Sequence, residues 1–582
     1  MTPILVALSI GIPWLGALVV WLIGDQHERW QHWLAIVFSA AAGVVAILLI
    51  PGASSDTALL IPIGGIFGDF AFVADGMGIF LSIIATVIGC LAIVFSMSYM
   101  KGEAQLGRYY AFVLFFIGAM VGLVLTSNLL LVFVFWEITA LCSYALIAFH
   151  NDDPKAVRGG IKALIITSIG GVGLLVGALL VYALTGTTDM QTFLSAAGSL
   201  PKNLLAVLAF GFLAAAAAKS AQFPFQTWLP DAMEAPSPIS ALIHAATMVN
   251  AGVYLLARFY PAFKDVPYWR EAVMVVGVLS ALLAAVMALT SYDLKRVLAY
   301  STVSQLGYMV YAIGTGHVFF SQFHLFSHSI FKALLFLGAG AVIHSVGTRD
   351  MREMGGVGKK LPIVKWVFII GALALSGIPI LNGFWSKELI LEGGLKGGPV
   401  WLYIVMLIVA GLTALYTARC VWLVFFGEPR SEYHAHPAGI PMLVALVPLA
   451  AAALVNWLGV GRFSLLMGEK TLPFHAIEAF GLKDMLHEVL SIPTLIALVV
   501  IGLGILLWFL RDKLEGVTNG LRSIRWAAEK SFGFEAINSA VVSVTHSIAE
   551  AVRRTQTGLL GWNVVGIVLT VIVLFAILIL GA

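Results

Sequence analysis

Three ionisable side chains, His324, His328 and Lys332, recur at four-residue intervals in an otherwise apolar stretch. Residues spaced in this way share one face of an α-helix. A histidine can take up a proton on one ring nitrogen and release one from the other near neutral pH. A single buried histidine is usually structural, but three such groups on one face indicate a proton pathway. A metal site is disfavoured, because Lys332 on the same face would repel a bound cation.

Two further buried charges, Glu137 and Lys219, are expected to act together. Glu137 lies in Leu129-Leu-Leu-Val-Phe-Val-Phe-Trp-Glu-Ile, too far from either end of that run for a short carboxylate to reach water. Lys219 follows five alanines, and small residues allow helices to approach closely. A carboxylate beside a lysine strengthens the lysine's hold on its proton, and separating the pair weakens it. The alternatives are a neutral structural Glu137 and a Lys219 that reaches back to the membrane surface.

The remaining candidates are His244 and the neighbouring pair Lys387 and Glu388. His244, in Ser-Ala-Leu-Ile-His-Ala-Ala-Thr-Met, is a single weaker signal that a structural histidine would also explain. Lys387 and Glu388 follow a Pro- and Gly-containing break and could instead form a local pair at a helix end. The predicted proton relay therefore comprises Glu137, Lys219, His244, His324, His328, Lys332, Lys387 and Glu388.

The composition places these charges in lipid. Of 582 residues, 60% are hydrophobic and 11% are charged, against about a quarter charged in soluble domains. The three cysteines are dispersed, and no dinucleotide fingerprint or P-loop follows a predicted strand. We therefore expect no cofactor, no metal, no nucleic-acid partner and no redox centre in this chain.

Runs of about 20 apolar residues predict an all-α polytopic membrane protein with about sixteen transmembrane helices. The spans are expected at 3–23, 33–50, 78–99, 109–126, 128–149, 161–184, 204–223, 239–260, 271–290, 297–314, 321–345, 364–384, 400–426, 439–460, 490–510 and 560–581. Lys and Arg concentrate in the loops after odd-numbered spans, which predicts that these loops are cytoplasmic and that both termini face the other side. Asp293, Lys295 and Arg296 are interpreted as part of an ordinary charged loop there. The first span is interpreted as a transmembrane helix of the mature protein rather than as a cleaved signal peptide. The protein is expected in the cell's inner (plasma) membrane.

Two spans are predicted to be broken at matching places. Lys219-Ser-Ala-Gln-Phe-Pro-Phe-Gln-Thr-Trp-Leu-Pro230 and Ser376-Gly-Ile-Pro-Ile-Leu-Asn-Gly-Phe-Trp-Ser-Lys387 each combine Pro, polar residues and a lysine. They lie five spans apart, so the two copies would face opposite ways, as in an inverted repeat. Two unrelated kinked helices are the alternative.

A polar, basic segment at 511–556 is predicted to form an amphipathic helix along the membrane surface, with Gly516, Gly520 and Gly533 as points where it would break. Its apolar residues at helical spacing are Leu514, Val517, Leu521, Ile524 and Ala527. A cytoplasmic loop with helical pieces is the alternative. The expected organisation is 1–108 (helices 1–3), 109–260 (first five-helix repeat), 261–426 (second, inverted repeat), 427–510 (helices 14–15), 511–556 (surface segment) and 557–582 (last transmembrane helix).

Over about residues 65–425 the sequence resembles the antiporter-like subunits of respiratory complex I, Mrp-type sodium/proton antiporters and membrane-bound hydrogenases. The resemblance lies in Lys219-Ser-Ala-Gln-Phe-Pro-Phe-Gln-Thr-Trp-Leu-Pro through His244, in Asp293-Leu-Lys-Arg-Val-Leu-Ala-Tyr-Ser, and in His328-Ser-Ile-Phe-Lys332. It implies two inverted five-helix bundles with Glu137, Lys219, His324, His328, Lys332 and Lys387 as their working residues. The span count is similar to that of the L-type complex I subunit or the first part of the A-type Mrp subunit, and Thr167-Ser-Ile-Gly-Gly171 looks more like the latter.

The resulting hypothesis is a proton-translocating subunit of a multisubunit ion-pumping complex. Its partners would be other membrane subunits, protons and the lipid bilayer, with sodium left open as a second ion. Membership of a proton-translocating NADH:quinone oxidoreductase or a related hydrogenase is left open too. The alternatives are a structural clamp subunit without transport of its own, and a proton-supplying partner of a solute or inorganic-carbon transporter.

Overall fold

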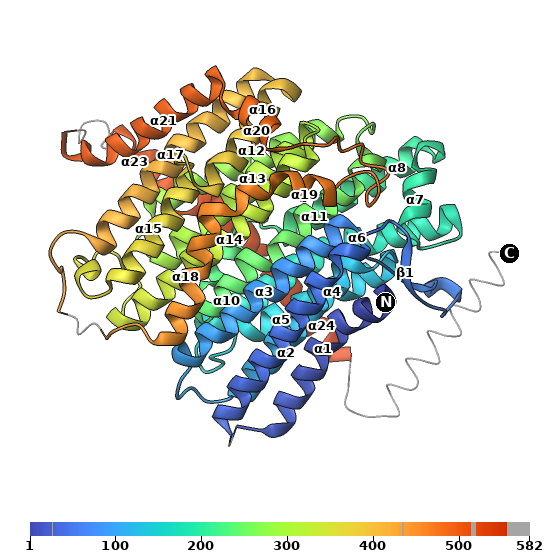
Figure 1. The fold of residues 1–582 in the computed structure, drawn as a ribbon, viewed down its shortest axis with the longest axis horizontal. Coiled ribbons are helices and arrows are strands. Elements are labelled where there is room, and N and C mark those ends of the chain that lie inside the picture. The colour runs from blue at the N-terminus through green and yellow to red at the C-terminus, as the bar shows by residue number, and fades with distance from the viewer. Residues whose placement is uncertain (26, 433–435, 514–519, 556–582) are drawn as a thin grey trace. The chain divides into compact units, whose positions relative to one another are not determined.

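A computed structural model describes residues 1–25, 27–432, 436–513 and 520–555 (Figure 1). The chain divides into two compact units, Met1–Glu529 and Lys530–Ala582, which are considered separately. The predicted last span, 560–581, lies outside the described residues.

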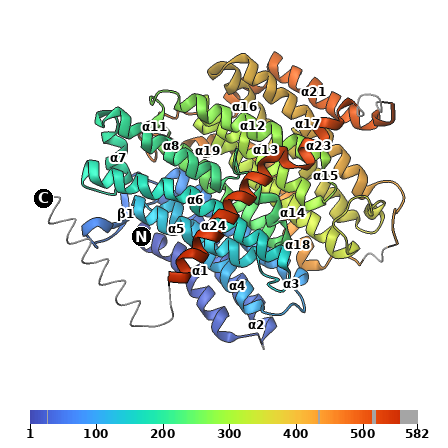
Figure 2. The same ribbon diagram turned by 180° about the vertical axis from the view of Figure 1, so that it is seen from behind.

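The first unit is a bundle of long helices with one small sheet (Figures 1 and 2). Its N-terminal part contains α1 (Thr2–Ile23), α2 (Glu28–Leu48), η1 (Ile50–Gly52), β1 (Thr57–Ile61), η2 (Gly65–Phe67), β2 (Phe70–Val73) and α3 (Gly76–Tyr99). β1 and β2 pair antiparallel, with Leu60 opposite Ala71.

The next part holds the first group of candidate residues. It comprises α4 (Leu106–Leu125), α5 (Leu129–Ile147), α6 (Pro154–Thr185), α7 (Met190–Ala196), η3 (Ala197–Ser199), α8 (Lys202–Lys219), α9 (Trp228–Asp231), η4 (Ala232–Glu234), α10 (Ser237–Ala241), the π-helical turn η5 (Leu242–Ala246) and α11 (Met248–Phe263). α6 begins seven residues before the predicted 161, because Asp153 caps it by accepting from Lys155 N at 2.8 Å.

The third part holds the second group. It comprises α12 (Trp269–Thr290), α13 (Leu294–Gly314), α14 (Val318–Val346), η6 (Val357–Lys359), α15 (Pro362–Ser376), α16 (Asn382–Gly397), α17 (Val400–Phe425), α18 (Ile440–Val455), η7 (Asn456–Gly459), α19 (Val460–Leu466), α20 (Leu482–Val489), α21 (Ile492–Phe509), η8 (Arg511–Lys513) and α23 (Arg522–Glu529).

Among the described residues, 13 helices are long and apolar enough to cross a membrane, which confirms an all-α polytopic membrane protein. Two predicted spans do not qualify. α13 is too polar, with Ser301, Thr302, Ser304 and Gln305 all buried. α15 is apolar but has only 15 residues, because Gly377 ends it with φ +81°.

Both predicted helix breaks are present. α8 ends at Lys219, and Ala221 with φ +50° turns the chain out of the helix before α9. α15 ends at Ser376, and the chain resumes as α16 at Asn382. The predicted span 364–384 is thus wrong at its end: the helical run stops at Ser376, and Lys387 and Glu388 lie inside a new helix, not at a helix end.

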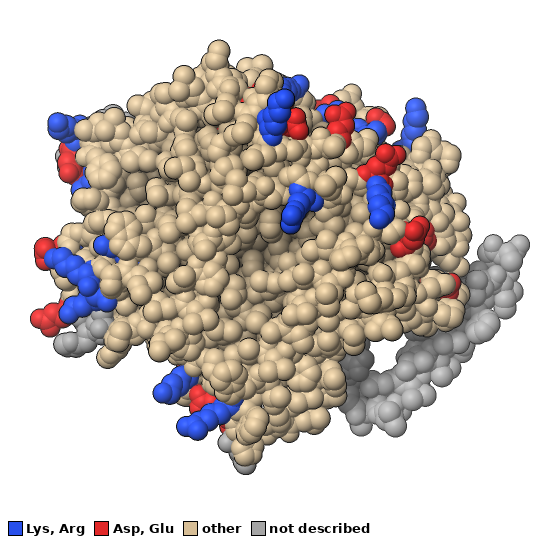
Figure 3. All heavy atoms as spheres, viewed as in Figure 1, with Lys and Arg blue, Asp and Glu red and all other residues tan. Residues whose placement is uncertain are grey.

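The surface of the first unit suits lipid. Large apolar side chains lie exposed along the outer helices, among them Trp21, Leu22, Ile404, Ile440 and Leu495. Figure 3 shows one face on which charged side chains lie mainly near the edges. Apolar atoms facing outward over so broad an area are expected where hydrocarbon is the solvent.

The described part of the second unit consists of η9 (Ser531–Gly533) and α24 (Phe534–Thr555). The predicted surface segment is therefore interrupted near Gly533, which has φ +84°. Positions 514–519, including Leu514, Gly516 and Val517, lie outside the described residues. Within α24 the exposed apolar residues Ile537, Val541, Val544, Ile548 and Val552 recur at helical spacing on one side of the helix.

Candidate functional site

Glu137 lies on α5, where a glycine of α6 makes room for it. An added Cβ at Gly171 would lie 2.5 Å from Glu137 Oε1, so no other residue fits there without moving the carboxylate. Ser168 Oγ donates to Glu137 Oε2 at 2.7 Å. Glu137 Oε1 has no hydrogen-bond partner among the described residues. The carboxylate is thus held at one oxygen and is available at the other.

Lys219, the last residue of α8, is fully buried beside this carboxylate. Its Nζ donates to Trp136 O at 2.7 Å and lies 4.9 Å from the centre of the Trp136 ring. Glu137 acts on Lys219 electrostatically, but in the described part of the chain the two do not form an ion pair. The predicted direct pairing is therefore replaced by a contact with the carbonyl oxygen of the residue preceding Glu137.

α6 and α8 pack closely enough to hold Lys219 near α5 because small residues face each other between them. An added Cβ at Gly170 would lie 2.3 Å from Ala218 Cβ, and one at Gly173 would lie 2.4 Å from Gly211 O. Figure 2 shows the two helices side by side. The alanine run before Lys219 thus has the packing role that its composition predicted.

His244 lies in the π-helical turn η5 and is fully buried. Neither ring nitrogen has a hydrogen-bond partner among the described residues, and the ring stacks on Phe336 of α14 at 4.9 Å. The charge of Lys332 on α14 acts on this ring. His244 therefore joins the α14 residues, with both of its nitrogens available to water or to a proton.

The three predicted residues of α14 lie on its buried face. The rings of His324 and His328 are 6.4 Å apart, and all three side chains are fully buried. Lys332 Nζ donates to Leu298 O at 3.0 Å and also to Ser301 Oγ, both on α13. Neither ring nitrogen of His328 has a partner within the described residues.

His324 has a hydrogen-bond partner at each ring nitrogen. Nδ1 lies 2.9 Å from Ser386 Oγ, and Nε2 lies 3.1 Å from Gln305 Oε1. Ser386 donates its hydroxyl hydrogen to Asn382 O at 2.9 Å, so it must accept from His324 Nδ1. With Nδ1 as the donor, Nε2 of a neutral ring is an acceptor, which does not match the amide oxygen of Gln305 placed beside it. A half-turn of that amide would present its NH₂ and suit the neutral ring, and Gln305 Nε2 has no other partner among the described residues.

Lys387 and Glu388 are buried inside α16, each 1% exposed. Lys387 Nζ donates to Ser376 O, at the end of α15, at 2.9 Å. Gly377 permits this approach, because a Cβ there would lie 2.7 Å from Lys387 Nζ. Ser386, the residue before Lys387, lies 2.9 Å from His324 Nδ1, so the α14 row and the α16 pair are neighbours.

Polar side chains that the sequence reasoning missed bridge the two groups. Ser220, next to Lys219, donates to Val249 O at 2.6 Å. Asn250 donates to Ala245 O at 2.8 Å and to Ser329 Oγ at 3.3 Å, and so links the turn of His244 to the helix of His328. These buried amides and hydroxyls connect the two halves through hydrogen bonds.

The interpretation of Lys295 as part of an ordinary charged loop is wrong. Asp293 caps α13 by accepting from Arg296 N at 3.0 Å, so the helix starts three residues before the predicted 297. Lys295 is 4% exposed, donates to Ala235 O and acts on His244 electrostatically. It lines a polar cavity of about 280 Å³ together with Glu234 and Arg349, among others. The Asp-Leu-Lys spacing, with a capping Asp just before the lysine, was the signal that could have revealed it.

A second buried charged group lies between α3 and α11. Asp75 caps α3 by accepting from Gly78 N at 2.9 Å, and Arg258 Nη2 donates to Asp75 Oδ1 at 3.0 Å. His475 from the loop after α19 bonds Ala257 O through Nε2 at 3.0 Å. Burial and the charge of Arg258 lower the pKa of His475 to about 4. In the described ranges, no three His, Cys, Asp or Glu side chains gather as a metal site would require.

Two family models match the chain. Residues 126–413 match the membrane domain described as "NADH:quinone oxidoreductase/Mrp antiporter, TM". Residues 60–110 match "NADH-Ubiquinone oxidoreductase (complex I), chain 5 N-terminus". The first range runs from the start of α5 into α17 and includes every predicted relay residue.

Curated relatives agree with these models. NAD(P)H-quinone oxidoreductase chain 5 of Synechocystis sp. is 42% identical over 395 residues, covering 65% of this chain and 58% of the relative. The chloroplastic subunit 5 of Spinacia oleracea is 42% identical over 375 residues, covering 62% and 50%. The chain thus spans between half and three fifths of the length of these relatives.

Solved structures show the same fold. A chain of the Mrp complex from Dietzia sp. superposes with a TM-score of 0.83 at 28% identity, over 99% of this chain and 63% of that one. A chain of the archaeal membrane-bound sulfane sulfur reductase superposes with a TM-score of 0.72 at 24% identity, over 83% and 99%. From these matches, the chain belongs to the family of antiporter-like membrane subunits shared by NADH:quinone oxidoreductases and Mrp antiporters.

Proposed function

We propose that this chain translocates protons as the antiporter-like subunit of a multisubunit, ion-pumping membrane complex. One observation carries the proposal: the buried ionisable residues form a sequence of neighbours rather than isolated charges. Lys219 Nζ bonds the carbonyl of Trp136, the residue before the half-buried Glu137, at 2.7 Å. The ring of His244 stacks on Phe336, one helical turn after Lys332, at 4.9 Å. The ring of His324 lies 6.4 Å from that of His328 and 2.9 Å from the hydroxyl of Ser386, the residue before Lys387. Ionisable groups within a membrane are costly and therefore rare, and they usually mark a pathway for ions or protons.

The chemistry of each step is proton exchange between fixed side chains and water. Lys219, Lys332 and Lys387 each rest on a backbone carbonyl oxygen, and His244 and His328 have ring nitrogens without protein partners among the described residues. His324 passes a proton by taking it on one nitrogen and releasing it from the other, while the Gln305 amide turns to match. Serine hydroxyls and Asn250 hold intervening water in line.

The proposal includes the arrangement of the repeats, the path of the protons and the orientation of the chain in the membrane. Residues 109–260 and 261–426 form two five-helix units of inverted orientation, with the breaks after Lys219 and after Ser376 as equivalent points. Protons enter from the cytoplasm near Lys219 and His244 and leave near Lys387. Both termini face the non-cytoplasmic side of the plasma membrane.

Partner subunits supply the driving force, either electron transfer or an opposing ion gradient. NAD(P)H-quinone oxidoreductase and the Mrp complex, named for the relatives, are the two kinds of assembly that fit. The sequence resemblance to Mrp-type sodium/proton antiporters makes sodium the candidate counter-ion for the second kind. Co-purifying chains that carry flavin or iron–sulfur centres would distinguish the first.

The test uses vesicles that contain the whole complex. Glu137→Gln and Lys332→Met are each expected to slow proton movement by more than about tenfold, because each removes one link of the row. Lys264→Met, an exposed lysine just after α11, is the matched control and should move protons as the wild type does. Proton movement at the wild-type rate in both test variants, with the complex assembled, would overturn the proposal.

A clamp role is the second candidate, and the exposed apolar stripe of α24 favours it. Replacing Val541 and Val544 of this stripe with Asp should then lower the yield of assembled complex. The relay variants Glu137→Gln and Lys332→Met should leave that yield unchanged. Scoring assembly separately from proton movement therefore separates the two roles.

A further inference from the structure

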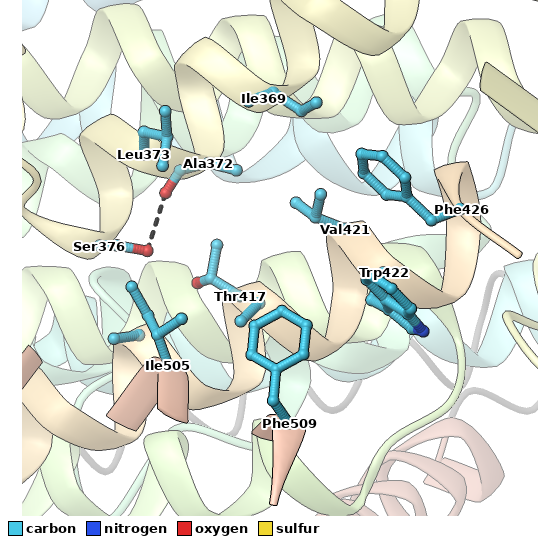
Figure 4. A pocket seen from close by; sticks show the side chains of 12 residues that line it. Ile369, Ala372, Leu373, Ser376, Thr417, Val421, Trp422, Phe426, Ile505 and Phe509 are labelled. Carbon is cyan, nitrogen blue, oxygen red and sulfur yellow. Dashed lines mark hydrogen bonds between the residues drawn. The ribbon is translucent and has the colours of Figure 1, made fainter. Parts of the chain in front are cut away.

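An elongated apolar cavity lies between α15, α17 and α21, away from the relay face of α14 (Figure 4). Its volume is about 240 Å³. Its walls are mainly aliphatic and aromatic. Of the two hydroxyls in the lining, that of Ser376 donates to Ala372 O at 2.9 Å, and that of Thr417 has no hydrogen-bond partner among the described residues. Ala410, Ala414 and Ile501 form a packed apolar cluster at its base.

The cavity is long and narrow. Its lining residues run from Ala414 of α17 to Phe426, the residue just after that helix, which is about 18 Å at about 1.5 Å per helical residue. A helix, about 10 Å across with its side chains, needs far more room than this volume provides. A single flexible hydrocarbon chain has the right shape and polarity.

The mouth of the cavity is ringed by aromatic side chains. Trp422 stacks on Phe426 at 5.6 Å and meets Phe509 edge-on at 5.4 Å. All three are more than a third exposed. An exposed Trp such as Trp422 is typical of the border between hydrocarbon and headgroups.

A cation without an acidic partner stands at this mouth. Lys365 Nζ lies 5.9 Å from the centre of the Phe426 ring and 4.8 Å from that of Trp366. In the part of the chain that the structure describes, Lys365 makes no ion pair, whereas nearby Lys359 pairs with Glu428 at 3.3 Å. Lys365 is therefore available to a negative group that lies over the aromatic rim.

We propose that the cavity binds one acyl chain of an anionic phospholipid, with the headgroup phosphate at Lys365. The apolar slot takes the chain, the rim lies at the glycerol level, and the cation selects the charge of the headgroup. Ser376 at the inner end is also the residue whose carbonyl accepts from Lys387, so the bound lipid adjoins the relay. The site is distinct from every residue of the proposed proton pathway.

The experiment measures lipid retention by native mass spectrometry on the full chain in its assembled complex. Phosphatidylglycerol and phosphatidylcholine with identical acyl chains are titrated separately. Ala418→Phe fills the cavity from α17 and should weaken retention of both lipids by more than about tenfold. Ala372→Leu fills it from α15 more gently and should act in the same direction, which covers the case in which the first variant does not assemble.

Charge and polarity are tested by three further variants. Lys365→Gln should weaken retention of phosphatidylglycerol by about fivefold and leave retention of phosphatidylcholine unchanged. Lys360→Gln, an exposed lysine five residues earlier, is the matched control and should change neither. Thr417→Val keeps the shape of a lining residue without its hydroxyl and should change neither, since an acyl chain makes no hydrogen bond.

Each contrary result overturns the proposal. Wild-type retention of both lipids in the two cavity-filling variants means that no chain occupies the cavity. An equal effect of Lys360→Gln and Lys365→Gln means general surface charge rather than a headgroup site. Loss of retention in Thr417→Val means an occupant with a polar group inside the cavity, such as a quinone.

Discussion

Lys219→Met should abolish proton movement without weakening the fold. Lys219 is fully buried, and of its three N–H donors one has a partner among the described residues, Trp136 O at 2.7 Å. Trp136 O also accepts from Thr139 Oγ1 at 2.7 Å, so the carbonyl is not left unsatisfied when the lysine is removed. Methionine is similar in length and fills the space that the aliphatic part of the lysine leaves.

The magnitude follows from two opposing terms. The cost of burying a lysine within the membrane, taken from values for a helix centre, is about 2.5–3.5 kcal/mol. A hydrogen bond to a charged group contributes about 1.5–3 kcal/mol. Removing both should therefore change the free energy of unfolding by between about −0.5 and +2 kcal/mol, where the positive sign means a more stable protein.

The assay pairs two measurements on the purified complex. Thermal unfolding in detergent should show a midpoint no more than about 2 °C below that of the wild type. Proton uptake into vesicles, followed with a pH-sensitive dye, should fall by more than about tenfold. Lys202→Met, an exposed lysine at the other end of α8, is the control for both. A variant that unfolds early would show that Lys219 is structural, and one that moves protons normally would remove it from the relay.

Three further variants probe the hydrogen bonds of the site and one loop. Ser168→Ala removes the donor to Glu137 Oε2 and should slow proton uptake about fivefold, with Ser168→Thr restoring it; equal rates in all three proteins would contradict this role. Gln305→Glu places a carboxylate beside His324, which should hold a proton on that ring and slow proton uptake more than Gln305→Met does. Slower uptake in Gln305→Met than in Gln305→Glu would rule out the rotation of the Gln305 amide as a step of proton transfer. His475 has a folded pKa near 4, below its unfolded value of about 6.5, so the unfolded state binds the extra proton and stability falls as pH drops from about 6.5 to 4. Hydrogen exchange in 468–481 should rise over that range in the wild type and less in His475→Gln, and a flat wild-type profile would refute the assignment.

The all-α polytopic fold class and the shared buried face of the α14 residues could be predicted from the sequence, because both rest on simple periodicities, whereas Glu137 is only half-buried. Runs of apolar residues set most spans, and the four-residue spacing placed His324, His328 and Lys332 on one buried face. The two breaks were visible as Pro and Gly beside lysines. Helix starts were less accurate, since a capping residue such as Asp153 extends a helix into residues that hydropathy assigns to a loop.

Acceptors and bridging groups could not be predicted, because they depend on which helices meet. No pattern states that Lys219 lies on Trp136 O rather than on Glu137. Gln305 belongs to a polar helix whose side chains have several possible partners, and Asn250 acquires its role only from contacts with both Ala245 and Ser329. Lys295 was misjudged because its loop-like neighbours, Asp293 and Arg296, are a helix cap and a surface charge.

Lys219, Lys332 and Lys387 each donate a hydrogen bond to a backbone carbonyl oxygen, which affects the positions at which this sequence can change. A carbonyl oxygen survives any substitution of the residue that carries it, so positions 136, 298 and 376 can change side chain and still receive Lys219, Lys332 and Lys387. Gly171 and Gly377 cannot change as freely, because an added Cβ would lie 2.5 Å from Glu137 Oε1 or 2.7 Å from Lys387 Nζ. Substitutions should therefore be better tolerated at Leu298 and Ser376, which supply only a carbonyl oxygen to a lysine, than at these two glycines, which leave room for the relay side chains.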